Sequence, residues 1–295
     1  MKFTKLTSSV LAGATLLSLL APTASFAKTA TGDANANGGT ALPQTDKTTA
    51  GISFGDNDHN TNSGYLRLQM VPHVLDFGNH KVLDTTTPVF SATGKNDAKD
   101  NNDRDLNYES KGTNQTAILN TDDKDLSNVK NTAWATVVDK QVTRKNVDAD
   151  NTAESGNWTL KVSSDNELTK LDDQGAATTT TIPDAHISFD KTQTGRTNLV
   201  HELTAEDKDA TWTTDLAAAA TKETPKAASV VSSYINLALD GSSKADVAEA
   251  KQGEGQGADV FGWTPANIKL TMPETAKVEN AIYTANLTWT LDSTI

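Results

Sequence analysis

Two short motifs in the sequence place a serine near residues that could activate it for acyl transfer. Ser127-Asn128-Val129-Lys130 has the Ser-x-x-Lys spacing, and Ser164-Asp165-Asn166 has the Ser-Asp-Asn order. This chemistry needs the serine at the start of a buried helix, where the lysine removes its proton. Here the acidic run 122–125 precedes Ser127, and the third motif is missing because residues 191–195 read Lys-Thr-Gln-Thr-Gly. The sequence therefore predicts a protein without a catalytic site.

The histidines and acidic residues do not form a metal-binding pattern. None of the five histidines is paired at ligand spacing, and His201 lacks the second histidine of a zinc-binding helix. A calcium-loop spacing begins over residues 56–60, but Thr61 stands where glycine is needed and no glutamate closes the loop. A second acidic cluster comprises Asp97, Asp100, Asp103 and Asp105, and such loops are more often simply solvated. We therefore predict no metal and no cofactor.

The N-terminal segment, residues 1–27, has the three parts of a secretory signal. Lys2 and Lys5 precede an apolar stretch over residues 10–21, and Ser25 and Ala27 are the small residues of a signal-peptidase site. The apolar stretch is shorter than the about 20 residues that span a bilayer, which favours a signal over an anchor. We expect cleavage after Ala27 and a secreted, extracellular protein with no membrane span after signal removal.

The net negative charge of the chain limits the classes of partner that it can bind. Lys and Arg total 26 against 38 Asp and Glu, a formal net charge of −12. Signal cleavage would remove two lysines and no acidic residue, which changes the charge from −12 to −14. Nucleic acid and anionic lipid would be repelled by such a chain, so neither is expected as a partner. The sequence has no cysteine, so an exported fold would depend on packing without disulfides.

Residues 28–63 are rich in Thr, Ala, Asn, Gly and Asp, and this composition predicts a flexible low-complexity leader. Within it, residues 42–46 read Leu-Pro-Gln-Thr-Asp, close to the Leu-Pro-x-Thr-Gly signal of sortases. The glycine is missing, and no apolar segment with a basic tail follows. Covalent anchoring to a cell wall by this route is therefore not expected.

From Gly64 onward the apolar residues recur with a period of two, which is typical of half-buried strands. Strands are predicted near residues 65–71, 134–139, 158–163, 185–189, 235–239, 268–272 and 281–291. Polar loops are predicted between them, including 171–181 and 252–258, and short helical turns are predicted at 215–220 and 244–251. We predict one all-β domain over residues 64–295, an antiparallel β-sandwich with long polar loops, with its first and last strands in the same domain.

The same tripeptide occurs twice, as Trp158-Thr159-Leu160 and as Trp289-Thr290-Leu291. One interpretation makes both tryptophans core residues of neighbouring strands, and the other makes them an exposed platform for a sugar or peptide. The alternate positions from Ala281 to Leu291 are continuously apolar, as a core face would be, so we favour the core interpretation.

At these residues the sequence resembles the WxL domain proteins, cell-surface proteins of low-GC Gram-positive bacteria. The distal motif of the family matches Tyr283, Leu287, Thr288, Trp289 and Leu291. Its proximal motif matches Val137, Val138, Asp139, Gly156, Trp158 and Leu160. Further matches are Gly64, Leu66, Pro72, Leu75, Asp76, Phe77, Gly78, His80, Ile268, Leu270 and Pro273. The resemblance spans Gly64 to Leu291.

The resemblance implies non-covalent attachment to the bacterial cell wall, through peptidoglycan or another wall polymer. It also implies companions among other WxL proteins and anchored proteins of the same gene cluster. The cell-wall-binding residues carried over are Trp158, Leu160, Tyr283, Leu287, Trp289 and Leu291. Two other functions stay open: a secreted adhesin for host glycan or matrix protein, and a penicillin-recognising serine enzyme that would need Ser127, Lys130 and Ser164 in one pocket.

Overall fold

The computed structural model describes residues 39–50, 62, 64–80, 88–94, 123–141, 155–198 and 226–293. These ranges consist mainly of β-strands, together with the short 3-10 helices η2 (Lys124–Val129) and η5 (Pro265–Asn267). The strands are β1 Gln44–Ala50, β2 Leu66–Met70, β3 Val89–Ser91, β4 Ala133–Asp139, β5 Trp158–Ser164, β6 Leu168–Leu171, β7 Ala177–Ile182, β8 His186–Asp190, β9 Gln193–Thr197, β10 Val230–Val231, β11 Tyr234–Ala238, β12 Lys244–Ala250, β13 Gly257–Trp263, β14 Ile268–Thr271 and β15 Tyr283–Ser293.

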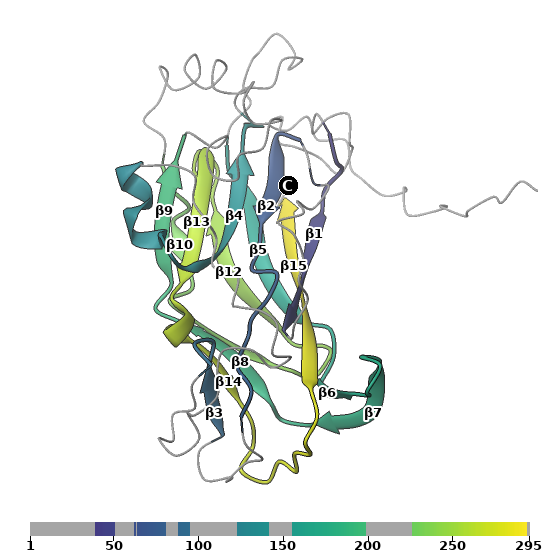
Figure 1. Cartoon of the computed structure of the whole chain (residues 1–295). Coiled ribbons are helices and arrows are strands. Elements are labelled where there is room, and N and C mark those ends of the chain that lie inside the picture. The colour runs from purple at the N-terminus through teal and green to yellow at the C-terminus, as the bar shows by residue number, and fades with distance from the viewer. Residues whose placement is uncertain are drawn as a thin grey trace, which may run out of the picture.

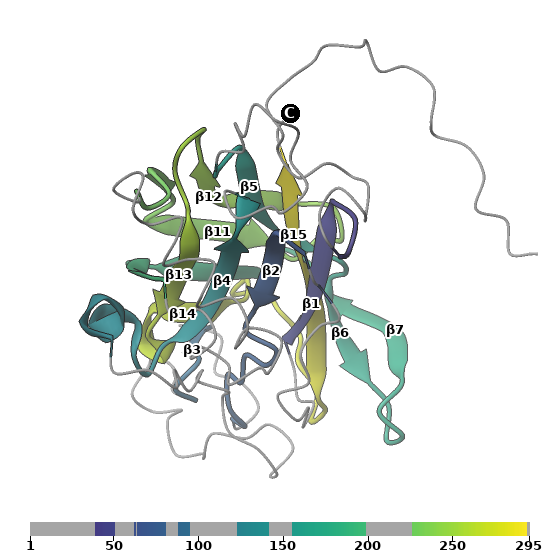
Figure 2. The same cartoon turned by 90° about the horizontal axis from the view of Figure 1, so that it is seen from above.

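Across the described ranges the strands form three antiparallel sheets (Figures 1 and 2). The largest has the order β10-β12-β5-β15-β6-β7, with β1 paired to the free side of β15. The other two have the orders β11-β8-β14-β3 and β2-β4-β13-β9. One core cluster takes residues from all three sheets, among them Leu68 of β2, Phe189 of β8 and Trp289 of β15. The predicted all-β antiparallel sandwich, with its first and last strands in one domain, is confirmed.

In strand β15 the alternating sequence pattern produces one buried face and one outward face. Ala285, Leu287, Trp289 and Leu291 are buried, while Asn286 and Asp292 are exposed. Successive side chains of a strand point to opposite faces, so the apolar set covers the core and the polar set faces outward. The predicted strands at 65–71, 134–139, 158–163, 185–189, 235–239 and 268–272 correspond to β2, β4, β5, β8, β11 and β14.

Strands β4 and β13 are buried on both faces. One face looks into the main core, and the other is covered by Leu126 and Val129 of η2, which lies beside β9 (Figure 1). Every position of β13 is buried, and residues 252–258 carry three glycines, so no polar alternation or run of large apolar side chains marks where this strand begins. The predicted loop at 252–258 is therefore wrong at its end, because Gly257 and Ala258 begin β13.

Two further local predictions are wrong. Lys244–Ala250, expected to include a helical turn, is strand β12, and it pairs with β5 on one side and β10 on the other. The predicted loop 171–181 contains most of β7 (Ala177–Ile182), which pairs with β6 as a hairpin. In both places strand pairing outweighs the local helix or turn preference. The turn expected at 215–220 lies outside the described residues.

The expectation that residues 28–63 are a flexible leader, with the domain beginning at Gly64, is wrong for Gln44–Ala50. This segment is strand β1, and it pairs residue by residue with β15, from Gln44 opposite Leu291 to Ala50 opposite Ala285. The Gln44 and Thr48 side chains are buried, and Gln44 Oε1 accepts a hydrogen bond from the backbone N–H of Leu68 at 3.0 Å. Strand β1 is therefore held in the sheet by hydrogen bonds. These do not require the alternating apolar residues by which a strand is predicted from sequence. The predicted signal, residues 1–27, lies outside the described residues.

Candidate functional site

The two Trp-x-Leu motifs lie on neighbouring strands of the largest sheet. Strands β5 and β15 pair antiparallel, with Leu160 opposite Leu291 and Val162 opposite Trp289. Both tryptophans and the leucines at 160, 287 and 291 have an exposed fraction of 0 %. The core interpretation of the motifs is therefore correct, and the platform interpretation is wrong. A buried indole cannot stack on a wall polymer, so these five side chains shape the domain from inside.

Aromatic rings form the centre of this core. The ring of Trp289 lies 5.9 Å from that of Trp263 and 6.0 Å from that of Phe189, and the Phe189 and Trp263 rings are 5.0 Å apart. The Trp158 ring contacts Phe261 edge-on at 6.4 Å. These centroid distances and tilted geometries are favourable for aromatic pairs. The cluster joins strands β8, β13 and β15, which belong to three different sheets.

The buried indole N–H groups differ in whether they find a hydrogen-bond partner. Trp289 Nε1 donates to Thr48 Oγ1 at 2.6 Å, and Trp263 Nε1 donates to Thr192 Oγ1 at 2.9 Å. Trp158 Nε1 finds no hydrogen-bond partner among the described residues. Its ring packs against Gly255, where an added Cβ would lie 2.8 Å from Nε1. A larger residue at position 255 would therefore displace the first motif tryptophan.

A buried carboxyl group lies just before the first motif. Asp139 Oδ2 accepts from the backbone N–H of Gly156 at 2.6 Å, and Oδ1 accepts from that of Gln141 at 2.9 Å. Burial raises the pKa of Asp139 from its ordinary value of 3.8 to about 7, against the lowering effect of these hydrogen bonds. Gly156 has a φ of +91°, and an added Cβ would lie 1.9 Å from the carbonyl oxygen of Lys251. Only glycine fits at this position.

A second buried acid, Asp259 on β13, was not singled out from the sequence. Burial raises the pKa of Asp259 to about 7, and the nearby Arg196 guanidinium on β9 acts in the opposite direction. The Arg196 side chain donates to Asn198 Oδ1 at 3.0 Å and also to the Gln256 carbonyl. Asp259 Oδ2 has no hydrogen-bond partner in the described ranges. Its position in an apolar, glycine-rich strand was the one sequence signal that could have marked it.

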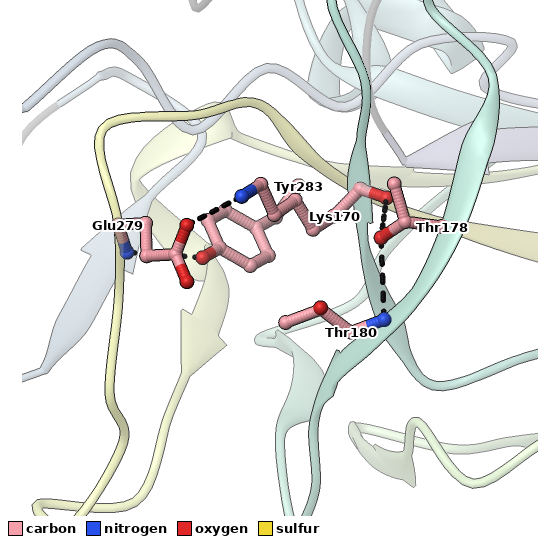
Figure 3. A network of polar contacts seen from close by, with 5 residues as sticks. All are labelled: Lys170, Thr178, Thr180, Glu279 and Tyr283. Carbon is pink, nitrogen blue, oxygen red and sulfur yellow. Dashed lines mark hydrogen bonds and ion pairs between the residues drawn. The ribbon is translucent and has the colours of Figure 1, made fainter.

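All six motif residues lie in the described ranges, and Tyr283 differs from the other five. It is half-buried at the start of β15, and it pairs with Lys170 of β6. Its hydroxyl accepts from the backbone N–H of Glu279 at 3.0 Å, and the Glu279 carboxylate forms an ion pair with Lys170 (Figure 3). On the same hairpin, Thr178 Oγ1 donates to the Lys170 carbonyl at 2.9 Å (Figure 3). Tyr283 is thus the motif residue at the surface.

The residues of the serine-enzyme motifs have structural roles. Ser127 and Lys130 are exposed on or next to η2, whereas Ser164 is buried at the end of β5 and donates to the Asn166 carbonyl at 3.0 Å. Asn166 Oδ1 accepts from the backbone N–H of Asn286 at 2.8 Å. Asp165 Oδ2 accepts from Thr288 Oγ1 at 2.8 Å. The Ser-Asp-Asn segment therefore fastens the turn after β5 to β15.

His201 and two acidic segments are the sequence features that come nearest to a metal site. His201 and the acidic positions over 56–60 and 97–105 lie outside the described residues. In the part of the chain that the structure does describe, no three His, Asp or Glu side chains gather as a metal site. Nor does any helix in those ranges have the length and apolar character needed to cross a membrane.

The two Trp-x-Leu motifs thus lie on paired strands in the core of a β-sandwich. The family model described as "WxL domain surface cell wall-binding" matches residues 35–294. The chain therefore belongs to the WxL domain family and is a cell-wall-binding surface protein. No curated protein and no solved structure matches it significantly. The match begins ahead of β1, in agreement with the place of that strand in the sheet.

Proposed function

We propose that this protein is secreted and attaches non-covalently to the peptidoglycan of a Gram-positive cell wall. The family match over residues 35–294 is the observation that carries the proposal. The signal-like segment 1–27 supports export, and the incomplete sortase motif at 42–46 supports attachment without a covalent bond. Other WxL proteins and anchored proteins of the same gene cluster are proposed as companions on the wall.

Charge limits how this attachment works. Gram-positive walls carry anionic polymers, and a mature chain of charge near −14 is repelled by them at a distance. Attachment must therefore rest on hydrogen bonds and aromatic contacts to glycan or peptide, or on bridging cations. This favours peptidoglycan over the anionic polymers as the ligand.

We further propose that the six motif residues have two different roles, one in stabilising the fold and one in contacting the wall. The five buried ones, Trp158, Leu160, Leu287, Trp289 and Leu291, hold the sandwich together. Tyr283 contacts the wall, because it brings an aromatic ring to the surface beside the β6–β7 hairpin, which projects from the side of β15 (Figure 2). Thr179, Thr180 and Thr181 of that hairpin are exposed and add hydroxyl groups that suit a glycan.

The test is a pulldown of the mature protein with purified peptidoglycan, with and without wall teichoic acid. We expect retention on peptidoglycan alone and equal or weaker retention when teichoic acid is present. Retention only in the presence of teichoic acid would overturn the ligand assignment.

A pair of tyrosine variants tests the contact surface. Tyr283→Ala should lower retention severalfold, whereas Tyr234→Ala should leave it unchanged. Tyr234 is a suitable control because its side chain is 56 % exposed on β11, in a different sheet. Melting curves of both variants separate lost binding from lost folding. Equal retention of the two folded variants would remove Tyr283 from the site.

We propose a binding role without catalysis. The described positions of Ser127 and Ser164, one exposed beside β9 and the other hydrogen-bonded within the largest sheet, support this. Incubation with a fluorescent penicillin should leave the mature protein unlabelled. A covalent adduct on Ser127 or Ser164 would contradict the proposal.

A further inference from the structure

The Asp139 carboxyl group lies inside a closed set of hydrogen bonds. Besides the two backbone N–H groups that donate to it, Gln141 Nε2 donates both to Asp139 Oδ2 at 3.3 Å and to the Gly156 carbonyl at 3.0 Å. Asp139, Gln141 and Gly156 are all buried. We call this set of three residues the Asp139 latch.

The latch connects two sheets at the start of the first motif. Asp139 is the last residue of β4, in the sheet β2-β4-β13-β9, and Gly156 stands two residues before Trp158 at the beginning of β5. Gly156 also packs tightly against the carbonyl of Lys251, the residue after β12. The carboxyl group therefore determines where the chain enters β5, and with it where Trp158 meets Phe261 in the core.

The charges around the latch come from several elements. Asp259 of β13 faces Asp139 and repels its charged form. Arg196 of β9 attracts Asp259, and Glu254, in the segment between β12 and β13, repels it. The neighbouring lysines are Lys140, which follows Asp139 in the chain, and Lys251, whose carbonyl contacts Gly156. A buried carboxyl group beside another buried carboxyl group favours its neutral form, although the three N–H groups aimed at it favour the charged one.

We propose that Asp139 is the positioning residue of the Trp158 motif, and that the protonation state of its carboxyl group affects how the start of β5 is held. In acid the neutral group stays in the core without a charge to bury. In alkali the charged group must remain there beside Asp259. The neutral carboxyl group costs less to bury, so the folded domain around the start of β5 is more stable in acid, although each N–H donor binds the charged form more strongly. This role of Asp139 is a property of the domain itself and is independent of the identity of the wall ligand.

The backbone amide of Gly156 reports this directly, because it donates to Asp139 at 2.6 Å. In ¹⁵N-labelled wild-type protein we expect its proton shift to titrate between pH 5 and 8, with a midpoint near 7. The amide of Gly175, on the exposed β6–β7 turn, bonds to the Asp172 carbonyl and serves as an internal control that stays flat. A Gly156 shift that does not move over this range in the folded protein would overturn the proposal.

Two variants sharpen the test. Asp259→Asn removes the neighbouring charge that raises the pKa of Asp139, so the Gly156 midpoint should move to lower pH. Asp139→Asn should abolish the titration of Gly156. An unchanged midpoint in folded Asp259→Asn, or a persisting titration in folded Asp139→Asn, would contradict the assignment. If Asp139→Asn does not fold, the wild-type and Asp259→Asn titrations still decide the question.

Discussion

The indole nitrogen of Trp289 lies 2.6 Å from the hydroxyl oxygen of Thr48, a residue 241 positions earlier in the chain. The same hydroxyl donates to the carbonyl of Pro72, in the segment after β2. One threonine of β1 therefore joins the second Trp-x-Leu motif to the segment that follows β2. The family match, which begins at residue 35, likewise includes the segment that holds Thr48.

Replacing Thr48 by valine tests that connection. The change keeps the shape of the side chain but leaves the Trp289 N–H and the Pro72 carbonyl buried without a partner, which should lower the free energy of unfolding by about 1–3 kcal/mol. Urea denaturation followed by tryptophan fluorescence measures it. Thr45→Val on the exposed face of β1 is the matched control and should change stability by less than about 0.5 kcal/mol. Equal effects of the two variants would show that the hydroxyl of Thr48 is unimportant.

Truncating Trp289 tests its role in the core. Trp289→Ala removes the ring that packs on Trp263 and Phe189, and it should cost roughly 3–5 kcal/mol. Thermal melting should show a fall in Tm on the order of 10 °C. Thr290→Ala, one residue further on the outward face, should cost less than about 1 kcal/mol. A Trp289→Ala protein that melts like the wild type but no longer binds the wall would return the tryptophan to the role of a ligand platform.

Stability should fall as pH rises through neutrality. Burial raises the pKa values of Asp139 and Asp259 to about 7 in the folded protein, while the unfolded chain keeps values near 3.8. The folded state therefore binds more protons than the unfolded state between these values, and this contribution is lost as pH rises through 7. The free energy of unfolding should be higher at pH 5 than at pH 8 by about 2–3 kcal/mol for each of the two groups.

Urea midpoints at the two pH values measure this difference, and Asp139→Asn should reduce it. Asp173→Asn, at an exposed turn, should leave it as in the wild type. A wild-type midpoint that is the same or lower at pH 5 would mean that these carboxyl groups are ionised in the folded core throughout.

Attachment to the wall should also be stronger in acid. Between pH 8 and pH 4–5, carboxylates of the acidic surface begin to protonate, and repulsion from anionic wall polymers declines. Binding isotherms on whole cell walls should show higher affinity at pH 4–5 than at pH 8, and divalent cations should act in the same direction. Affinity that is constant over this range and insensitive to a chelator would show that charge does not govern attachment.

A comparison of whole walls with walls stripped of their anionic polymers separates the two pH effects. If surface charge dominates, stripping should remove most of the pH dependence. If the Asp139 latch dominates, the dependence should persist on stripped walls and disappear in folded Asp139→Asn protein.

Much of the fold was accessible from local patterns. The alternation in β15 predicted its buried face from Ala285 to Leu291, and similar patterns located β2, β4, β5, β8, β11 and β14. The repeated Trp-x-Leu tripeptide identified the family, and the continuous apolar face favoured core tryptophans, which the structure confirms. These features are encoded locally because a strand that packs on a core needs alternating or continuous apolar residues wherever it lies.

The tertiary structure decided what depends on a distant partner. Strand β1 is polar, and it became a strand because β15 supplies its backbone hydrogen bonds and Trp289 supplies a donor for Thr48. Strand β13 lost its alternation because η2 covers its second face. Asp139 reads as one acidic residue among many, and only burial against Gly156, Gln141 and Asp259 gives it an altered pKa. Hydrogen bonds and desolvation act between residues far apart in the chain, so no local pattern records them.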